Sequence, residues 1–315
     1  MKYSFVLPAY KARFLKEAID SILSQTHEDF ELIIVNDASP EDLDSIVKEY
    51  KDERIQYYVN DINLGGKDLV AQWNHSVAYA KGEYLILASD DDLYDPRYLE
   101  EMDKLIKRFP ESDVFRPRIQ YINNESEVID IAGCPREYCS GIEYLLFLIR
   151  GWIGSGVPFY VFRRSALDNI GGFADYPSAW FSDDATALRL SSNGIISSKE
   201  VLFSFRTSGI NISSRLNSRN DLINKFSATE MYYSEFSLYI DSYVALNDYE
   251  RCVKECLKAE FAVCLHNRAR TQLFHSKLLT ATQLLPMALK LPFGSSGRLL
   301  LFYIVNLIKK CLRIG

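Results

Sequence analysis

Short apolar runs alternate with amphipathic segments in the first part of the chain, and this alternation constrains the fold more than any other feature. The runs at 3–7, 30–35, 55–59 and 84–88 have the length and composition of buried strands. Between them, segments such as 15–23 carry apolar residues at helical spacing. This pattern predicts an α/β fold, with a mostly parallel sheet flanked by helices.

The pattern changes along the chain, and the change predicts two domains. Residues 113–206 mix helices with short strands, which we expect at 113–122, 127–131, 157–162 and 200–206. The pattern beyond 215 is helical, with helices expected at 221–246, 249–273, 277–289 and 298–312. We therefore expect an α/β domain at 1–215 and an α-helical C-terminal region at 216–315. A length of 315 residues with 48% hydrophobic content suits two domains with substantial cores.

Charge and cysteine usage exclude some functions. The net charge of −6 argues against nucleic acid as a partner, because phosphate binding requires an excess of basic residues. The six cysteines form no CxxC pair, so they indicate neither a zinc ribbon nor a redox motif and fit a reducing compartment. Cys252, Cys256 and Cys264 are expected to be buried small side chains, with metal ligation as the alternative. The apolar run at 3–7 meets Pro8 too early for a secretory signal. We expect a cytoplasmic protein.

Polar residues follow three of the four expected strands. Pro8 and Tyr10 follow the first, Asp37 follows the second, and residues 90–92 (DDD) follow the fourth. Ligands of parallel sheets bind beyond the carboxyl ends of the strands, so these residues are candidates for a binding site. Three adjacent carboxylates repel one another, and a divalent cation such as Mg²⁺ or Mn²⁺ would relieve the repulsion. The alternative is a solvated acidic loop that caps the next helix.

The motifs in this order resemble those of the family-2 glycosyltransferases, which have the GT-A fold. The match runs over roughly residues 2–210, and it is the ordered series rather than any single motif that makes it specific. The motifs are VLPAY at 6–10, VNDAS at 35–39, NLG at 63–65 with Asn74, GEY at 82–84, DDD at 90–92 with Pro96, GGF at 171–173, and DD at 183–184.

The resemblance implies a nucleotide-binding role for several residues. Asp37 corresponds to the aspartate that binds the base, usually uracil, and Pro8 and Tyr10 border the base and ribose. Arg206 resembles a diphosphate-binding arginine, and Lys67 is a second candidate for a phosphate contact. The alternatives are a helix cap for Asp37, an ordinary turn at Pro8, and solvated surface charges at Lys67 and Arg206.

The resemblance also assigns the acidic run to the family's metal-binding DXD motif. Alignment on Pro96 places Asp91 and Asp92 at the usual positions, and Ser89 replaces a common leading aspartate. We expect Asp92 as the first ligand of Mg²⁺ or Mn²⁺, with Asp90 or Asp91 as its helper. The register stays open by one residue.

The pair Asp183–Asp184 resembles the family's ED motif, whose aspartate takes the proton from the acceptor hydroxyl. A direct match of the pair makes Asp184 the base, which we favour, whereas the downstream LRL at 188–190 makes it Asp183. The two side chains point about 100° apart on a helix, so only one can face the donor. Trp180 and Phe181 either stack on an acceptor sugar or belong to the core.

The resemblance implies an inverting, metal-dependent transferase of bacterial surface-polysaccharide synthesis. It would move a sugar from a nucleotide-diphosphate donor, with UDP favoured, to a hydroxyl of a glycan or lipid-linked acceptor. Nucleotidyl transfer is disfavoured, because the turn at 8–11 (PAYK) lacks a glycine-rich signature. The alternative from another class is a non-catalytic subunit that binds sugar nucleotides or acts as a scaffold.

The end of the chain has its own electrostatic character. Residues 261–315 contain eight Lys and Arg and no Asp or Glu. Within them, 298–313 combine a short apolar run with basic flanks, too short to span a bilayer but suited to an anionic membrane surface. The protein is therefore expected to be cytoplasmic, with peripheral attachment to the inner face of the membrane as an option. The alternative is a terminal helix packed on its own domain.

Overall fold

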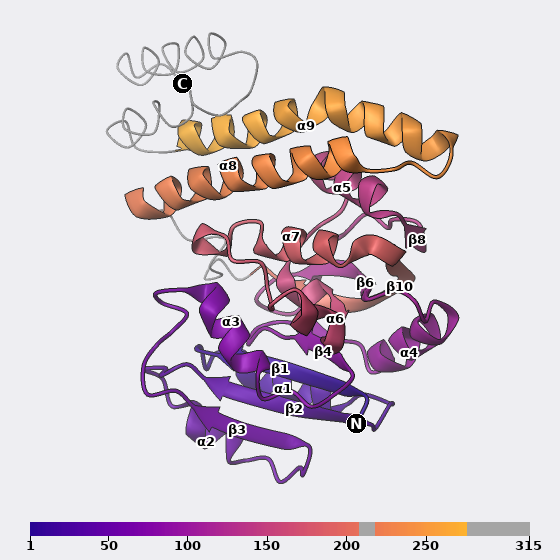
Figure 1. Ribbon diagram of the computed structural model, residues 1–315. Coiled ribbons are helices and arrows are strands. Elements are labelled where there is room, and N and C mark those ends of the chain that lie inside the picture. Colours follow the sequence, from indigo (N-terminus) through magenta and orange to yellow (C-terminus); the bar gives the residue numbers. More distant parts are fainter. Residues whose placement is uncertain (208–217, 276–315) are drawn as a thin grey trace. The chain divides into compact units, whose positions relative to one another are not determined.

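The computed structural model describes residues 1–207 and 218–275. The described chain divides into two compact units (Figure 1). The first contains Met1–Asp175 and the described residues of Ser182–Ser214, and the second contains Tyr176–Phe181 and the helices after 217. The helices expected at 277–289 and 298–312, and the predicted domain boundary at 215/216, lie outside the described residues.

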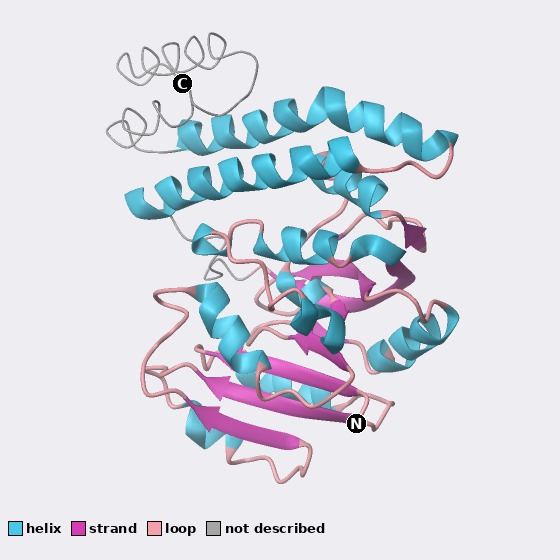
Figure 2. Cartoon of the chain, in the orientation of Figure 1, coloured by secondary structure: helices cyan, strands magenta, loops and turns pink. Residues whose placement is uncertain are grey.

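The first unit is an α/β unit whose described strands form one ten-stranded sheet. Its main path runs β3-β2-β1-β4-β9-β6-β10-β5, while β7 pairs with β6 and β8 pairs with β10. Figure 2 shows the strands in magenta and the helices in cyan. The strands are β1 (Tyr3–Ala9), β2 (Phe30–Asn36), β3 (Ile55–Val59), β4 (Tyr84–Leu87), β5 (Leu93–Tyr94), β6 (Val114–Ile122), β7 (Val128–Ile131), β8 (Tyr138–Cys139), β9 (Val161–Arg163) and β10 (Ile195–Arg206).

The first four strands of the path are parallel, as the alternation of the sequence predicts. Val6 of β1 lies between Ile33 of β2 and Leu87 of β4. All three side chains are at most 1% exposed, and burying one such aliphatic side chain contributes about 1.5–3 kcal/mol. The carboxyl ends of these four strands therefore meet at one edge of the sheet. This confirms the predicted GT-A-like architecture, a mostly parallel sheet flanked by helices.

Helices cover this sheet and join its strands. In α1 the apolar residues Leu15, Ala18, Ile19 and Ile22 are buried, so the predicted 3.6-residue period faces the core. The helices of this unit are α1 (Leu15–Leu23), α2 (Leu43–Val47), α3 (Leu69–Val77), α4 (Tyr98–Arg108), α5 (Gly141–Ile149), α6 (Arg164–Asn169) and α7 (Ser182–Arg189), with short 3₁₀ turns η1 (Val157–Phe159) and η3 (Ser191–Asn193).

Two strand predictions differ from the structure. The strand expected at 157–162 begins as η1, and only β9 pairs in the sheet, because Pro158 has no N–H to donate to a ladder. β10 begins at Ile195 rather than at 200. Its polar stretch at 197–200 hid the strand from the apolar pattern, and a register shift between Ser197 and Val201 accommodates it.

The second unit contains a pair of long helices, α8 (Arg219–Ser242) and α9 (Asp248–His275), which lie side by side (Figure 1). A reciprocal capping box between Ser218 and Asp221 starts α8. Tyr232 packs on Phe236 of α8 and on Phe261 of α9, which builds an aromatic core between the helices. Within the described part of the chain, none of the helices has the length and apolar character needed to traverse a bilayer.

Candidate functional site

The acidic run after β4 is held against the turn after β1. Oδ2 of Asp90 accepts hydrogen bonds from the backbone amides of Tyr10 and Lys11, each at 2.8 Å. These charge-assisted bonds fix the relative positions of two strand ends that are 80 residues apart in sequence. Asp90 therefore organises this edge of the sheet, and its predicted contact with a metal stays a prediction.

Arg206, at the end of β10, holds the same run from the other side. Its amide donates to Oδ1 of Asp92 at 2.8 Å, and its Nε donates to the carbonyl of Asp91 at 2.8 Å. The side chain is 0% exposed and also pairs with Glu17 at 2.8 Å. The guanidinium is thus occupied by protein groups instead of lying on the surface, and its predicted diphosphate contact stays a prediction.

We expect Arg206→Met to destabilise the protein by about 3–5 kcal/mol, because it leaves buried carbonyl oxygens and Glu17 without their partner. Urea unfolding at constant pH measures the effect. Arg97→Met is the matched control, since Arg97 is 52% exposed beside Asp95 and should change stability by about 1 kcal/mol or less. Unchanged stability of the Arg206 variant with weakened nucleotide binding would instead favour the diphosphate role.

The three carboxyl groups of the acidic run share an environment that disfavours their charge. Burial raises the pKa of Asp90, and burial together with the charge of Asp90 raises the pKa of Asp91 to about 6. Burial and the charge of Asp91 raise the pKa of Asp92 well above its usual range. Oδ2 of Asp92 is buried and makes no hydrogen bond among the described residues. A divalent cation would relieve both the repulsion and the desolvation.

The carboxylates therefore fit a cation chemically, although they do not form a closed cage. Within residues 1–207 and 218–275 no three His, Cys, Asp or Glu side chains are grouped as ligands of one ion. Mg²⁺ commonly uses one or two protein carboxylates and completes its shell with water and substrate phosphates. An open carboxylate site at this edge is compatible with that mode of binding.

Asp37, after β2, holds the loop that follows β3. It accepts hydrogen bonds from Nδ2 of Asn60 at 2.7 Å and from the amides of Leu64 and Gly65 at 3.0 and 2.8 Å. A carboxylate has about four acceptor positions, so three donors leave room for a ring N–H. Lys67, two residues beyond Gly65, is exposed on the same loop. Base recognition by Asp37 and a phosphate contact of Lys67 stay predictions.

Tyr10 and Pro8 lie at the same edge as Asp37. The last pair of the β1–β2 ladder joins Ala9 to Asn36, so the turns that follow these strands begin side by side. Tyr10 is 36% exposed, and its carbonyl accepts a hydrogen bond from Ser39 at 2.6 Å. The structure thus brings the predicted base-binding and ribose-binding residues together, and what they bind stays a prediction.

The Asp183–Asp184 pair begins α7, as the resemblance predicts for an ED motif. Asp183 is partly exposed, whereas Asp184 is 5% exposed. Oδ2 of Asp183 accepts from the Ser155 hydroxyl at 3.2 Å, and Oδ1 accepts from the Asp184 amide at 2.9 Å. Burial, followed by the charge of Asp184, raises the pKa of Asp183 to about 7. One carboxyl group of the pair is therefore poised to accept a proton near neutral pH.

Strand pairing places Asp183 at the same sheet edge as the acidic run. β9 runs antiparallel to β4, with Leu85 opposite Phe162, so the start of β9 lies beside the carboxyl end of β4. Ser155, which holds Asp183, lies shortly before the start of β9. The acidic run and the proton-accepting carboxylate thus converge although they are about 90 residues apart.

The segment just before α7 belongs to the helical unit. Phe181 stacks on Tyr232 of α8 with ring centroids 4.5 Å apart, and Nζ of Lys225 lies 4.3 Å from the centre of the Trp180 ring. Phe181 is 6% exposed and has a positive φ of 72°, a conformation that a bulky residue adopts only when packing demands it. Phe181 is therefore a core residue of that unit, whereas Trp180 is partly exposed.

Two contributors to this edge were missed by sequence reasoning. Ser155 belongs to no motif, and Glu17 lies on the expected exposed face of α1. Their roles depend on long-range contacts that leave no local signal. Arg116 was missed as well, because Arg118 and Gln120 in the same strand are also polar and only the structure shows that Arg116 is buried.

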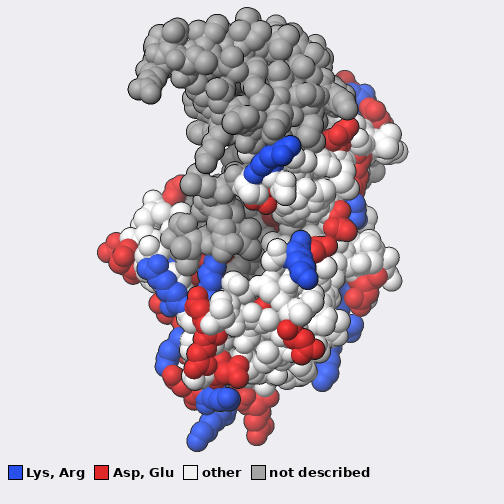
Figure 3. All heavy atoms as spheres, turned by 90° about the vertical axis from the view of Figure 1, so that its left-hand side faces the viewer, with Lys and Arg blue, Asp and Glu red and all other residues white. Residues whose placement is uncertain are grey.

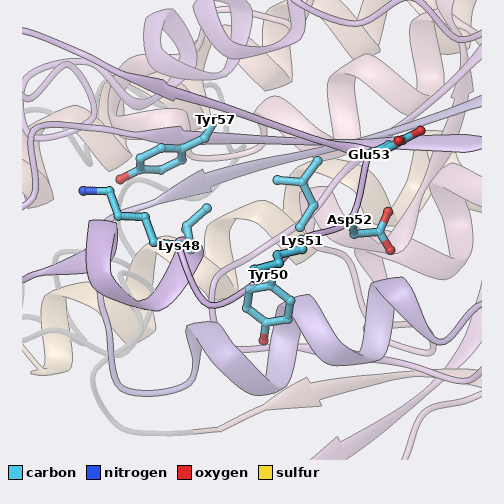
Figure 4. Close-up of a pocket in the computed structure, with 8 residues that line it drawn as sticks. Lys48, Tyr50, Lys51, Asp52, Glu53 and Tyr57 are labelled. Atoms are coloured by element: carbon cyan, nitrogen blue, oxygen red, sulfur yellow. The ribbon is translucent and has the colours of Figure 1, made fainter.

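A surface depression elsewhere on the α/β unit is not part of this site. It lies beside α2 and β3 (Figure 4) and shares no residue with the acidic run or the Asp183–Asp184 pair. Its lining residues are Val47, Lys48, Tyr50, Lys51, Asp52, Glu53, Ile55 and Tyr57. Figure 3 looks onto the side toward which β2 and β3 point, where acidic and basic side chains are interspersed.

The order of the strands and the acidic edge define a GT-A-like α/β protein. A family model described as "Glycosyl transferase family 2" matches residues 4–171, which is more than half of the chain. The chain therefore belongs to glycosyltransferase family 2.

Proteins that are named as glycosyltransferases resemble part of the chain. An uncharacterized glycosyltransferase of Rickettsia typhi, RT0329, is 33% identical over 112 residues, which cover 35% of this chain and 34% of that protein. The putative glycosyltransferase EpsE of Bacillus subtilis is 36% identical over 111 residues, which cover 34% of this chain and 39% of EpsE. The similarity thus spans about a third of the length of these relatives.

Solved structures of the same architecture cover nearly the whole chain. S. aureus TarS 1–349 in complex with UDP-GlcNAc has a TM-score of 0.66 at 15% identity, covering 99% of this chain and 92% of that one. The mannosyltransferase PcManGT from Pyrobaculum calidifontis, in complex with GDP-Man and Mn²⁺, has a TM-score of 0.54 at 16% identity, covering 100% and 88%. At these identities the likeness establishes the fold alone.

Proposed function

We propose that this protein transfers a sugar from a nucleotide-diphosphate donor to an acceptor hydroxyl, with inversion at the anomeric carbon. The observation that carries the proposal is the convergence at one sheet edge of two different carboxylate sites. The acidic run at 90–92 is buried and crowded, whereas Asp183 is partly exposed with a pKa of about 7. Membership of glycosyltransferase family 2 supports this division into a donor site and a base.

Asp183 is the residue that we assign as the base. It is the more exposed member of the pair, and its pKa near neutrality suits a group that must be ionised in the resting enzyme and protonated after the transfer. The acceptor oxygen loses its proton to the Asp183 carboxylate as it attacks the anomeric carbon, and the bond to the nucleoside diphosphate breaks. An α-linked donor then gives a β-linked product.

Asp91 is the carboxylate that we assign as the first ligand of a divalent cation, and Asp92 is the second. Asp90 is bound to two backbone amides and Asp92 accepts the Arg206 amide, whereas the Asp91 side chain ties down no other described segment. This differs from the sequence expectation of Asp92 as first ligand. When bound, Mg²⁺ or Mn²⁺ supplies positive charge that stabilises the leaving diphosphate.

UDP is the donor nucleotide that we favour, with Asp37, Pro8 and Tyr10 bordering the base and ribose and Lys67 near the phosphates. TarS was solved with UDP-GlcNAc and PcManGT with GDP-Man, so both nucleotides belong in a donor screen. The test is release of free nucleotide from a panel of UDP- and GDP-sugars with Mg²⁺ or Mn²⁺. Turnover that is lost in Asp183→Asn supports a transferase, whereas nucleotide binding without turnover supports the non-catalytic subunit.

The acceptor that we propose is a glycan or a lipid-linked saccharide on the cytoplasmic side of the membrane. The basic, apolar residues 298–313 lie outside the described part of the chain and are the proposed contact with anionic lipid. The full chain should sediment with anionic liposomes at low salt and be released at high salt. Lys309→Glu with Lys310→Glu should weaken this sedimentation several-fold, and equal sedimentation of both proteins with neutral liposomes would contradict an electrostatic contact.

A further inference from the structure

A buried arginine near the proposed base has no carboxylate partner. Arg116, the third residue of β6, is 1% exposed, and within the described residues its hydrogen-bond partners are a hydroxyl and a carbonyl, with no acidic side chain among them. Its Nη2 donates to the carbonyl of Gly154 at 3.0 Å, and its Nη1 donates to the hydroxyl of Tyr144. Nε is buried without a hydrogen-bond partner. A guanidinium in such a position is costly unless its charge serves another group.

Hydroxyl groups connect this arginine to Asp183. The Tyr144 hydroxyl lies 2.9 Å from the Tyr160 hydroxyl, which lies 3.1 Å from Oγ of Ser155. Ser155 donates to Oδ2 of Asp183 at 3.2 Å. This series of hydrogen bonds thus connects β6, α5, the residues just before β9, and α7, and both tyrosines are 0% exposed.

The groups at the two ends of this hydrogen-bonded series, Arg116 and Asp183, fix the direction of every hydrogen bond in it. A guanidinium can only donate, so the Tyr144 oxygen accepts from Arg116. When the Tyr160 proton points to Ser155, the hydrogen bond between the two tyrosines must be donated by Tyr144. An ionised carboxylate can only accept, so the Ser155 proton points to Asp183 and the Tyr160 proton points to Ser155. All hydroxyl dipoles therefore align with their positive ends toward Asp183.

We propose that Arg116, Tyr144, Tyr160 and Ser155 form a positioning relay, which orients the Asp183 carboxylate and stabilises its ionised form through aligned hydrogen bonds. The proposal rests on the role of Asp183 as the base. The relay holds its protons in place and transfers none to the substrate. The four residues are positioning residues, because none of them is assigned a contact with donor or acceptor.

The relay opposes the influences that disfavour the Asp183 charge. Burial and the charge of Asp184 on the same helix raise the pKa of Asp183, and the Ser155 hydrogen bond lowers it. The other ionisable groups that face Arg116 are Tyr121 on β6 and Cys139 on β8, whose thiol pKa burial raises to about 12. Loss of a relay hydroxyl should therefore raise the pKa of Asp183 further.

Tyr160→Phe interrupts the relay, and Tyr98→Phe is its matched control. Tyr98 is also 0% exposed, but its hydroxyl makes no hydrogen bond among the described residues. Carboxyl ¹³C NMR of aspartate-labelled protein measures the result without any substrate, and the signal missing from Asp183→Asn identifies the residue. We expect its titration to move up by about one pH unit in Tyr160→Phe and not in Tyr98→Phe.

Ser155→Ala serves as a second variant, because Ser155 is partly exposed and its truncation does not disturb the core. It should give the same upward shift, and Ser155→Thr, which retains the hydroxyl, should restore the original titration. The acidic limb of the pH–rate profile should move with the NMR titration, while the KM of the donor stays unchanged.

These measurements separate the relay from the proposed reaction. A shifted Asp183 titration in a protein that turns over no sugar nucleotide would support the relay and contradict the transferase. An unchanged titration in both Tyr160→Phe and Ser155→Ala, with both proteins folded, would overturn the relay whatever the activity.

Discussion

Asp91→Asn is expected to lower the divalent-dependent affinity for the donor nucleotide by about 100-fold or more and to abolish turnover, while the fold is kept. The physical reason is that the three carboxylates of the acidic run have different hydrogen-bond partners. Asp90 and Asp92 each accept backbone amides of other segments, whereas the carboxylate of Asp91 ties down no other described segment. A neutral amide at 91 therefore removes a cation ligand without releasing a strand end.

Nucleotide titrations with and without Mn²⁺ measure this effect, and thermal unfolding monitors the fold. Asp95→Asn is the matched control, because Asp95 lies four residues after Asp91 and pairs with the exposed Arg97. This variant also removes one negative charge. Asp92→Asn is the discriminating variant. If it loses nucleotide affinity with an intact fold while Asp91→Asn does not, the register predicted from the sequence, with Asp92 as first ligand, is correct.

Asp183→Asn is expected to lower kcat by about 10²–10⁴-fold, the usual contribution of a general base. The affinity for the donor nucleotide should change little, because Asp183 belongs to the acceptor side of the proposed reaction. Asp184→Asn, which removes the same charge from the neighbouring position, is the comparator. A large loss in Asp184→Asn and a small one in Asp183→Asn would establish the other register of the ED-like motif.

The pH dependence of stability tests the same residue without an assay. The pKa of Asp183 is raised from 3.8 to about 7 in the folded protein, so the folded state holds this proton more tightly than the unfolded chain. The corresponding stability is present at low pH and is lost as the pH rises from about 4 to about 7. Asp183→Asn should remove this loss of stability. The Tm of the variant minus the Tm of the wild type should therefore increase as the pH rises from about 4 to about 7.

The sequence predicted those features of the fold that depend on the local pattern of apolar and polar residues. Periodicity located β1, β2, β3 and β4, because apolar residues at strand or helix spacing report which face is buried. It also placed polar residues at the ends of the right strands. The same reasoning failed for η1, where Pro158 interrupts an apolar run, and at the start of β10, where four polar residues conceal a strand.

Composition and motif order also identified the family and the two carboxylate clusters. What they could not decide was which carboxylate of each cluster is free to react. Asp91 and Asp92 are chemically identical in sequence, and the Arg206 amide on Asp92 and the complete burial of Asp92 distinguish them. Asp183 and Asp184 likewise differ in exposure, and the Ser155 hydroxyl holds Asp183.

The sequence by itself thus determined the order of elements, the family, and the strand ends at which charged residues gather, because these follow from local chemistry and spacing. The tertiary structure decided which groups are buried, which are paired, and how Arg116 reaches Asp183 through three hydroxyl groups. The connection from Arg116 to Asp183 depends on the antiparallel insertion of β9 between β4 and β6. Pairing of segments this far apart is set by the packing of the whole sheet, which no local pattern records.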